Sequence, residues 1–288
     1  MAPALIQSAR MRTPIISLKD VSYRYPHSRG EGGAALEGIS LDINEGEFVG
    51  LVGANGSGKS TLAQLLNGLI EPDGGEVIID GMSTRSRHDL DRIRETVGMV
   101  FQNPENQIVA TSVEDDIAFG PENLGLPADE IERRVDEACR RFGLEHLRRS
   151  EPHWLSGGQK QRAVLAGVMA LQPRVLVLDE PTSMLDPRSQ RQLLDFVHGL
   201  WRSGVTVIYI TQLMEEVAAA PRVIAIAAGS TVFDGDPREL FSNQDLLEIT
   251  SLEPPLATRI GAALAARGRP LRPVLTLKEL VGEVCRPA

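Results

Sequence analysis

Gly53-Ala54-Asn55-Gly56-Ser57-Gly58-Lys59-Ser60 matches the phosphate-loop pattern GxxxxGK[ST], and the rest of the chain is best understood outward from it. It follows the apolar run Phe48–Val52 and opens residues 59–68, where leucines recur at helical spacing. The glycines let backbone N–H groups turn inward around phosphate oxygens, and the following helix adds its positive end. Lys59 brings a charge for the β- and γ-phosphates, and the Ser60 hydroxyl is placed to ligate Mg²⁺. The expected nucleotide contacts are Gly53, Asn55, Gly56, Ser57, Gly58, Lys59, Ser60 and Thr61.

An acidic strand end follows later, at Val175-Leu176-Val177-Leu178-Asp179-Glu180. A continuous apolar run is typical of a strand buried on both faces of a parallel sheet. Such sheets bind ligands at the carboxyl ends of their strands, so Asp179 is placed to hold Mg²⁺, directly or through water. Glu180 can then orient and polarise the attacking water. Alone, the pattern also fits two solvated acids; the phosphate loop upstream favours the catalytic interpretation.

A second phosphate-binding helix start is predicted at Leu155-Ser156-Gly157-Gly158-Gln159, called the signature loop below. Serine is a favoured N-cap residue, and the glycines leave the first backbone N–H groups accessible to an anion. We therefore expect nucleotide contacts from Ser156, Gly157, Gly158 and Gln159. One chain with two such helix starts and one acidic strand end suggests a dimer. Each nucleotide would lie between the phosphate loop of one subunit and the signature loop of the other.

These motifs follow one another as in the ATP-binding cassette (ABC) ATPases, which the sequence resembles over about residues 15–240. The resemblance implies ATP and Mg²⁺ as cofactors and hydrolysis of ATP as the reaction. It also implies that Tyr25 stacks on adenine, that Gln102 senses Mg²⁺ and contacts a transporter, and that Asp186 links the two sites of a dimer. The implied fold is α/β: a P-loop ATPase of the ABC type with a RecA-like parallel-sheet core, an antiparallel β subdomain, a helical signature subdomain and a small C-terminal appendage.

A narrower resemblance joins the chain to the ATPases of energy-coupling factor (ECF) transporters. Three stretches carry it: Phe101-Gln102-Asn103-Pro104-Glu105-Asn106-Gln107-Ile108-Val109, Val113-Glu114-Asp115-Asp116-Ile117-Ala118-Phe119-Gly120 and Thr182-Ser183-Met184-Leu185-Asp186-Pro187. These importers take up vitamins and transition-metal ions. The resemblance implies three partners: a second ABC ATPase subunit, alike or different, a membrane-embedded coupling protein and a substrate-binding membrane protein. It places the chain at the cytoplasmic face of the cell membrane, as a peripheral protein.

One position departs from the family pattern. A histidine usually follows the strand expected at residues 205–211, where this chain has Thr211-Gln212. We assign Gln212 to that catalytic position. An amide can hydrogen-bond a γ-phosphate oxygen but cannot become cationic. The substitution therefore predicts a weaker hydrolytic site.

The pattern along the chain predicts an N-terminal tail at residues 1–14, an ATPase domain at 15–235 with a helical subdomain at about 103–170, and a C-terminal appendage at 236–288 that could dimerise. Strands are expected at residues 15–25, 39–43, 48–52, 175–178, 205–211, 223–227 and 231–233. Helices are expected at residues 59–68, 129–149 and 187–201. Strands alternating with helices favour a parallel-sheet α/β core.

Composition narrows the class of partners. The formal net charge is -9 and the pI is about 5.2, so no global electrostatic attraction draws the chain to nucleic acid. The two cysteines, Cys139 and Cys285, lie in no metal-binding pattern. No apolar run approaches the ~18 residues that a membrane-spanning helix needs.

Two other functions stay open at this point. A soluble ABC ATPase of DNA repair or chromosome structure would carry a long coiled-coil or zinc insertion, and one of translation would usually carry two cassettes. Here about one hundred residues without sustained heptads separate the phosphate loop from the signature loop. A weakly hydrolysing regulatory cassette is the other alternative. The presence of Glu180 argues against this alternative, and Gln212 keeps it open.

Overall fold

A six-stranded sheet forms the centre of the computed structural model, which describes residues 13–26, 34–269 and 271–285. The strand order is β10-β9-β3-β8-β7-β6, in which β10 is antiparallel to β9 and the other neighbours are parallel. The strands are β3 (Phe48–Val52), β6 (Val97–Val100), β7 (Val175–Asp179), β8 (Thr206–Ile210), β9 (Arg222–Ala227) and β10 (Ser230–Gly235). The predicted tail at 1–14 falls largely outside the described residues.

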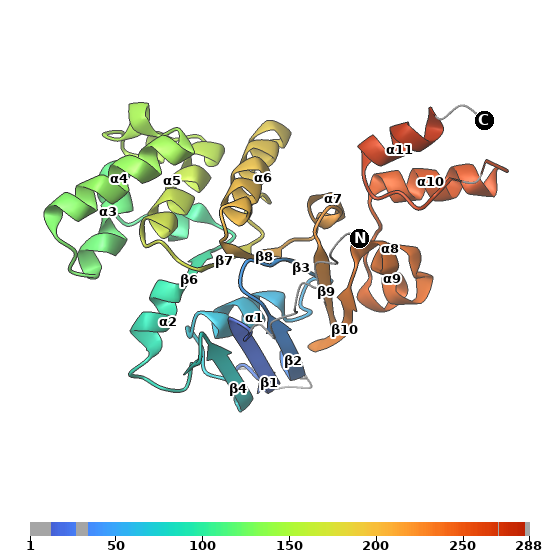
Figure 1. Cartoon of the computed structure of the whole chain (residues 1–288), viewed down its shortest axis with the longest axis horizontal. Coiled ribbons are helices and arrows are strands. Elements are labelled where there is room, and N and C mark those ends of the chain that lie inside the picture. Colours follow the sequence, from blue (N-terminus) through green and yellow to red (C-terminus); the bar gives the residue numbers. More distant parts are fainter. Residues whose placement is uncertain (1–12, 27–33, 270, 286–288) are drawn as a thin grey trace, which may run out of the picture.

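The central strands explain why the sequence signals there were clear. Every residue of β3, β7 and β8 is buried, as expected for parallel strands covered on both faces. Helices α1 (Lys59–Leu66) and α6 (Pro187–Arg202) follow β3 and β7 along the chain and cover the sheet (Figure 1). The four-residue strand β6, Val-Gly-Met-Val, was not predicted because it is too short to show a period.

A second, antiparallel sheet has the order β2-β1-β4-β5. Its strands are β1 (Ile16–Tyr23), β2 (Leu36–Ile43), β4 (Gly74–Ile79) and β5 (Met82–Ser83). Buried residues alternate along β2, which fits a strand with one face on the core. Leu36, Ile39 and Val77 share a hydrophobic cluster with α1 and one face of the parallel sheet. Both expected sheets are therefore present, and the predicted α/β fold class is confirmed.

Three helices form a separate group at one end of the parallel sheet, green in Figure 1. They are α3 (Val113–Asn123), α4 (Ala128–Phe142) and α5 (Gly157–Ala170); α2 (Leu90–Thr96) leads into β6. The predicted helix at 129–149 is wrong at its end. Gly143 adopts a φ of 64° and caps α4 in the left-handed conformation, which stops the helix after Phe142.

The C-terminal helices divide between two cores. Helices α8 (Pro237–Ser242) and α9 (Gln244–Thr250) pack Leu240, Phe241 and Leu247 into the main cluster. Helices α10 (Leu256–Ala266) and α11 (Leu277–Val284) form a small core of their own and stand away from the sheet (Figure 1). The last strand, β10, ends at Gly235, where the appendage was predicted to begin. The separate core of the C-terminal helices begins later, with α10. Among the described residues, no helix is long and apolar enough to span a bilayer.

Candidate functional site

The phosphate loop joins the end of β3 to the start of α1, as expected. Two of its glycines have positive φ and no room for a side chain. A Cβ on Gly53 (φ 150°) would lie 2.2 Å from the Ile226 carbonyl oxygen, and one on Gly58 (φ 109°) would lie 2.5 Å from that of Ala35. The loop is thus pressed against neighbouring backbone, with Gly58 as the N-cap of α1. Such backbone geometry suits a loop that wraps phosphate groups.

Lys59 bends back over the loop. Its Nζ donates to the carbonyl oxygens of Gly53 and Ala54, both at 2.9 Å. Burial lowers the pKa of Lys59, while the nearby carboxylates of Glu180 and Asp179 raise it. The ammonium group therefore lies between the loop carbonyls and the acidic strand end, where it can meet a phosphate without reaching into solvent.

Two of the three expected Mg²⁺ ligands, Ser60 and Asp179, are in contact, and the third, Gln102, bonds to the residue after Asp179. Asp179 ends β7 and is buried; burial raises its pKa, and the Ser60 hydroxyl, bonded to its carboxylate, lowers it. The Nε2 of Gln102 donates to Glu180. The side-chain carbonyl oxygen of Gln102 is therefore left to bind a metal ion. Hydroxyl, carboxylate and amide oxygens are hard donors of the kind Mg²⁺ takes beside nucleotide phosphates, so the donor set fits this ion.

Glu180 is held between two amides. Its Oε2 accepts from Gln102 Nε2 at 2.8 Å, and its Oε1 accepts from Gln212 Nε2. Gln212 Nε2 also donates to Asn55 Oδ1 at 2.6 Å. The backbone of Glu180 has a φ of 47°, and its N–H donates to the Ile210 carbonyl oxygen at 3.0 Å. A non-glycine residue in this left-handed region is strained, and such strain is characteristic of functional sites.

Tyr25 lies at the edge of the same loop. Its hydroxyl and that of Thr61 are 3.2 Å apart, and its ring meets Tyr23 edge-on with centroids 5.0 Å apart. The residue is 42% exposed. The arrangement joins two residues of the predicted set, and stacking on adenine stays a prediction.

The signature loop faces a different hollow. Ser156 caps α5, and Gln159 closes a capping box by accepting from the Ser156 N–H at 2.8 Å. Asp186 caps α6 by accepting from the N–H groups of Arg188 and Ser189. The Ser189 hydroxyl, and after it these two N–H groups, lower the pKa of Asp186. Ser156, Gly158, Gln159 and Asp186 line one depression, and the described phosphate-loop residues are absent from its lining. The signature loop and the phosphate loop of one chain therefore line different hollows.

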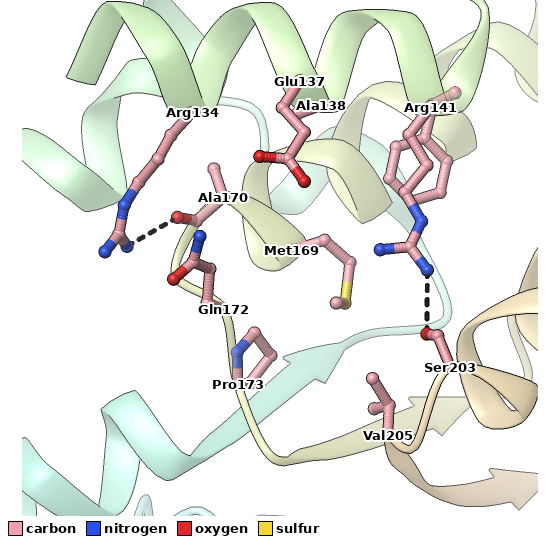
Figure 2. A pocket seen from close by; sticks show the side chains of 11 residues that line it. Arg134, Glu137, Ala138, Arg141, Met169, Ala170, Gln172, Pro173, Ser203 and Val205 are labelled. Atoms are coloured by element: carbon pink, nitrogen blue, oxygen red, sulfur yellow. Dashed lines mark hydrogen bonds between the residues drawn. The ribbon is translucent and has the colours of Figure 1, made fainter. Parts of the chain in front are cut away.

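A further hollow lies away from all predicted site residues. Figure 2 shows it between α4 and the loops that precede β7 and β8, with Arg134, Met169 and Ser203 among its lining residues. Arg141 crosses it to donate to the Ser203 hydroxyl at 3.0 Å. It opens at the amino ends of the parallel strands, whereas ligands of such sheets bind at the carboxyl ends. We therefore do not assign it to the nucleotide.

Sequence reasoning missed Glu216, a buried carboxyl four residues after Gln212. It lies in helix α7 (Met214–Val217). This helix directly follows residues 211–213, which we call the switch turn. The available signal was an acidic pair, Glu215-Glu216, among apolar residues, and such a pair also fits two solvated surface acids. The hydrogen bond between the side chains of Gln212 and Asn55 could not be predicted from the sequence, because these residues are 157 positions apart.

Comparison with known proteins finds consistent relatives. A family model described as ABC transporter matches residues 36–183. The energy-coupling factor transporter ATP-binding protein EcfA1 of Symbiobacterium thermophilum is 48% identical over 96% of this chain and 98% of its own length. That of Clostridium novyi is 44% identical over 96% and 99%.

Solved structures agree in fold. The structure of cbiO1 from Clostridium perfringens, part of the ABC transporter complex cbiONQ, has a TM-score of 0.74 and 35% identity, covering 88% of this chain and 97% of that one. A dimeric post-hydrolysis state of the ATP-binding cassette MJ0796, bound to ADP and Pi, has a TM-score of 0.69 and 30% identity, covering 77% and 98%.

The signature loop gives a test of local packing. A Cβ on Gly158 would lie 2.6 Å from Ser189 Oγ, whereas one on Gly157 would have its nearest contacts at 3.7 Å. We expect Gly158→Ala to lower the free energy of unfolding by ~1–3 kcal/mol because α5 must shift from α6. Gly157→Ala, the matched control, should leave it unchanged or raise it, since alanine favours helix. Urea unfolding of both variants decides; equal stabilities would contradict the packing described.

Proposed function

The chain belongs to the ATP-binding proteins of energy-coupling factor transporters, within the ABC transporter family, and from this premise we propose how its own residues hydrolyse ATP and to what the energy is coupled. The observation that carries the proposal is Glu180 held by Gln102 and Gln212 opposite the Lys59 loop. That arrangement places a carboxylate on one side of a bound phosphate, with a cation and a backbone cradle on the other.

The chemistry divides among the residues of the loop and of the strand ends. The phosphate loop holds the β- and γ-phosphates through backbone N–H groups, and Lys59 leaves its carbonyl acceptors to pair with phosphate oxygens. Ser60, Asp179 and Gln102 would hold Mg²⁺, which would neutralise charge on the phosphates. Glu180 accepts a hydrogen bond from the attacking water and aims it in line with the leaving group. When ATP is bound, Gln212 exchanges the Asn55 oxygen for a γ-phosphate oxygen and keeps its bond to Glu180, because its NH₂ group has two hydrogens.

A complete site needs a second ATPase subunit. The signature loop lines a depression apart from the phosphate loop of its own chain. The positive start of α5 suits the γ-phosphate bound by another copy or by a related chain. Asp186 lies in the same depression and would connect the two halves. One of the structural relatives is a dimeric ATP-binding cassette.

A membrane-embedded coupling protein would dock on the helical group. Gln107, Val109, Phe119 and Leu171 are among the residues that line a groove there, and Val109 and Phe119 are 61% and 49% exposed. Gln107 itself turns inward: its Oε1 accepts from the Phe101 N–H and its Nε2 donates to the Met99 carbonyl oxygen. It therefore shapes the loop, and Val109 and Phe119 are the better candidates for direct contact.

This docking places the chain on the cytoplasmic face of the cell membrane. We propose uptake of a vitamin or a transition-metal ion, chosen by a separate substrate-binding membrane protein. The domain division at residues 15–235 and 236–288 belongs to the same proposal, with α10 and α11 as a possible dimer contact. Identity of 48% over 96% of the chain to an ECF ATP-binding protein favours this role over a soluble ABC ATPase.

Exchanging Glu180 for glutamine tests the catalytic assignment. Glu180→Gln should keep ATP binding and abolish most turnover, because an amide cannot accept the proton of the attacking water. Lys59→Ala should instead lose ATP binding, since it removes the charge from an intact loop. ATP affinity and steady-state hydrolysis of the assembled complex separate the two effects. Hydrolysis at the parental rate in Glu180→Gln would refute the assignment.

A charge placed in the groove tests docking. Val109→Glu and Phe119→Glu should release the coupling protein and end transport, because a partner's apolar surface cannot solvate a carboxylate. Leu124→Glu, at the exposed C-cap of α3, is the matched control and should leave both unchanged. Co-purification with the coupling protein and an uptake assay provide the measurements. Undiminished yield and uptake in both groove variants would count against this surface.

Replacing Gln212 by histidine, the residue usual in the family, tests whether the departure from the family pattern weakens hydrolysis. Charge-assisted hydrogen bonds are about twice as strong as neutral ones. Gln212→His should raise the hydrolysis rate ~5- to 30-fold, because ~1.4 kcal/mol of transition-state stabilisation is worth about tenfold. Nucleotide affinity should stay within about threefold, since the loop contacts are unchanged. Both forms are assayed with the same partner subunit and Mg²⁺. An unchanged or lower rate in the histidine form would mean that the site is built around an amide.

A further inference from the structure

Glu216 is a buried carboxyl that the proposed hydrolysis does not use. It is 7% exposed, and Met214 and Val217 of the same short helix belong to the hydrophobic core. Burial raises its pKa, and the hydroxyls of Thr182, Thr211 and Tyr209 act in the opposite direction. Burying a carboxyl is costly unless it is hydrogen-bonded, so an apolar residue would pack here at lower cost. A structural or functional advantage must offset that cost.

The hydrogen bonds of Glu216 lead to the switch turn. Its Oε2 accepts from the Thr211 hydroxyl at 2.6 Å and from the Tyr209 hydroxyl at 3.2 Å. The Thr211 oxygen in turn accepts from the Leu213 N–H at 3.0 Å. The hydroxyl of Thr211 therefore bridges Glu216 to the residue after Gln212. The turn is fixed on both sides of Gln212.

Beyond this anchored turn, the side chain of Gln212 spans two other strand ends. Its Nε2 donates both to Glu180 and to Asn55. Both bonds form only when the Gln212 nitrogen lies at one place in space. That place matters for catalysis, because misplacement of a catalytic group by about 1 Å can cost two orders of magnitude in rate. A side chain with three torsions before its amide cannot hold that place unless its backbone is fixed. The hydrogen bonds of Glu216 and Thr211 fix that backbone.

We propose that Glu216 is a positioning residue that, through the Thr211 hydroxyl, locks the switch turn and so aims the Gln212 amide at Glu180 and at the γ-phosphate. This inference depends on the proposed roles of Gln212 and Glu180. Glu216 itself touches no nucleotide. Its removal leaves the phosphate loop intact but lets the turn and Gln212 move.

A double-mutant cycle in the assembled complex tests the proposal, with kcat, KM and thermal stability measured for each variant. Glu216→Ala should lower kcat about tenfold, the effect of ~1.4 kcal/mol, with KM for ATP within about twofold. In a Gln212→Ala background the same change should cost less than about twofold, because a residue that acts through Gln212 has nothing left to position. Thr211→Val, nearly isosteric, should follow the same pattern, and it carries the test should Glu216→Ala fail to fold.

Two controls separate positioning from general stability. Glu216→Gln should keep kcat within about twofold, since the amide oxygen can still accept from both hydroxyls. Glu215→Gln, on the same helix with an acceptor oxygen retained, should leave kcat unchanged. An equal loss of kcat for Glu216→Ala with and without Gln212, or no loss at all, would overturn the proposal. Glu180→Gln is run alongside: if it hydrolyses ATP at the parental rate, the proposed function fails, and if it is inactive while Glu216→Ala is harmless, the positioning role alone fails.

Discussion

The hydrogen bonds that hold the Glu180 carboxylate between two amides depend on four strand ends lying side by side. In the order β6-β7-β8-β3, Gln102 follows the first strand, Glu180 the second and Gln212 the third, while Asn55 follows the fourth. Since these strands are parallel, their carboxyl ends meet at one edge. Each strand delivers one side chain, so the register of the sheet sets the geometry of the site. The antiparallel sheet and the helices keep those strands buried and in register.

The sequence predicted well what local chemistry determines. The phosphate loop and the acidic strand end were located because glycine, lysine and two carboxylates occur at fixed spacing beside apolar runs. The helix at 187–201 was predicted within one residue of α6, since Pro187 and the capping Asp186 mark its start.

The sequence could not predict what tertiary contact determines. The nucleotide contact of Gln159 stays a prediction, and the sequence analysis did not foresee that its amide oxygen accepts from the Ser156 N–H. The ECF-like stretch at residues 101–109 likewise gave no sign that Gln107 pins this loop to Met99. Amides have no characteristic periodicity, and their partners are chosen by folding. The four-residue strand β6 was missed for a related reason: its neighbour β7 stabilises it more than its own sequence does.

Helix α7 shows how little chain is needed to connect distant parts. Glu216 faces inward to Thr211 and Tyr209, whereas Glu215 accepts from the Leu256 N–H at 3.0 Å. Leu256 begins α10, whose own N-cap, Pro255, offers no side-chain acceptor. The Glu215 carboxylate therefore satisfies an N–H at a helix start, where negative charge is favoured. One short helix supports both the switch turn and the C-terminal helices, so the two are joined by a polar contact as well as by the chain.

The amide at position 212 suits the ground state of this site. One NH₂ group carries two hydrogens, so Gln212 can donate to Glu180 and Asn55 from a single nitrogen. Charge on the phosphoryl oxygens shifts as the bond to the leaving group breaks, and a neutral donor responds to that change less than a cationic one. Only interactions that strengthen in the transition state accelerate the chemical step. We therefore expect an amide to hold Glu180 and the nucleotide and still to contribute less to turnover than an imidazolium, so that the change at this position lowers the rate and not the binding of ATP.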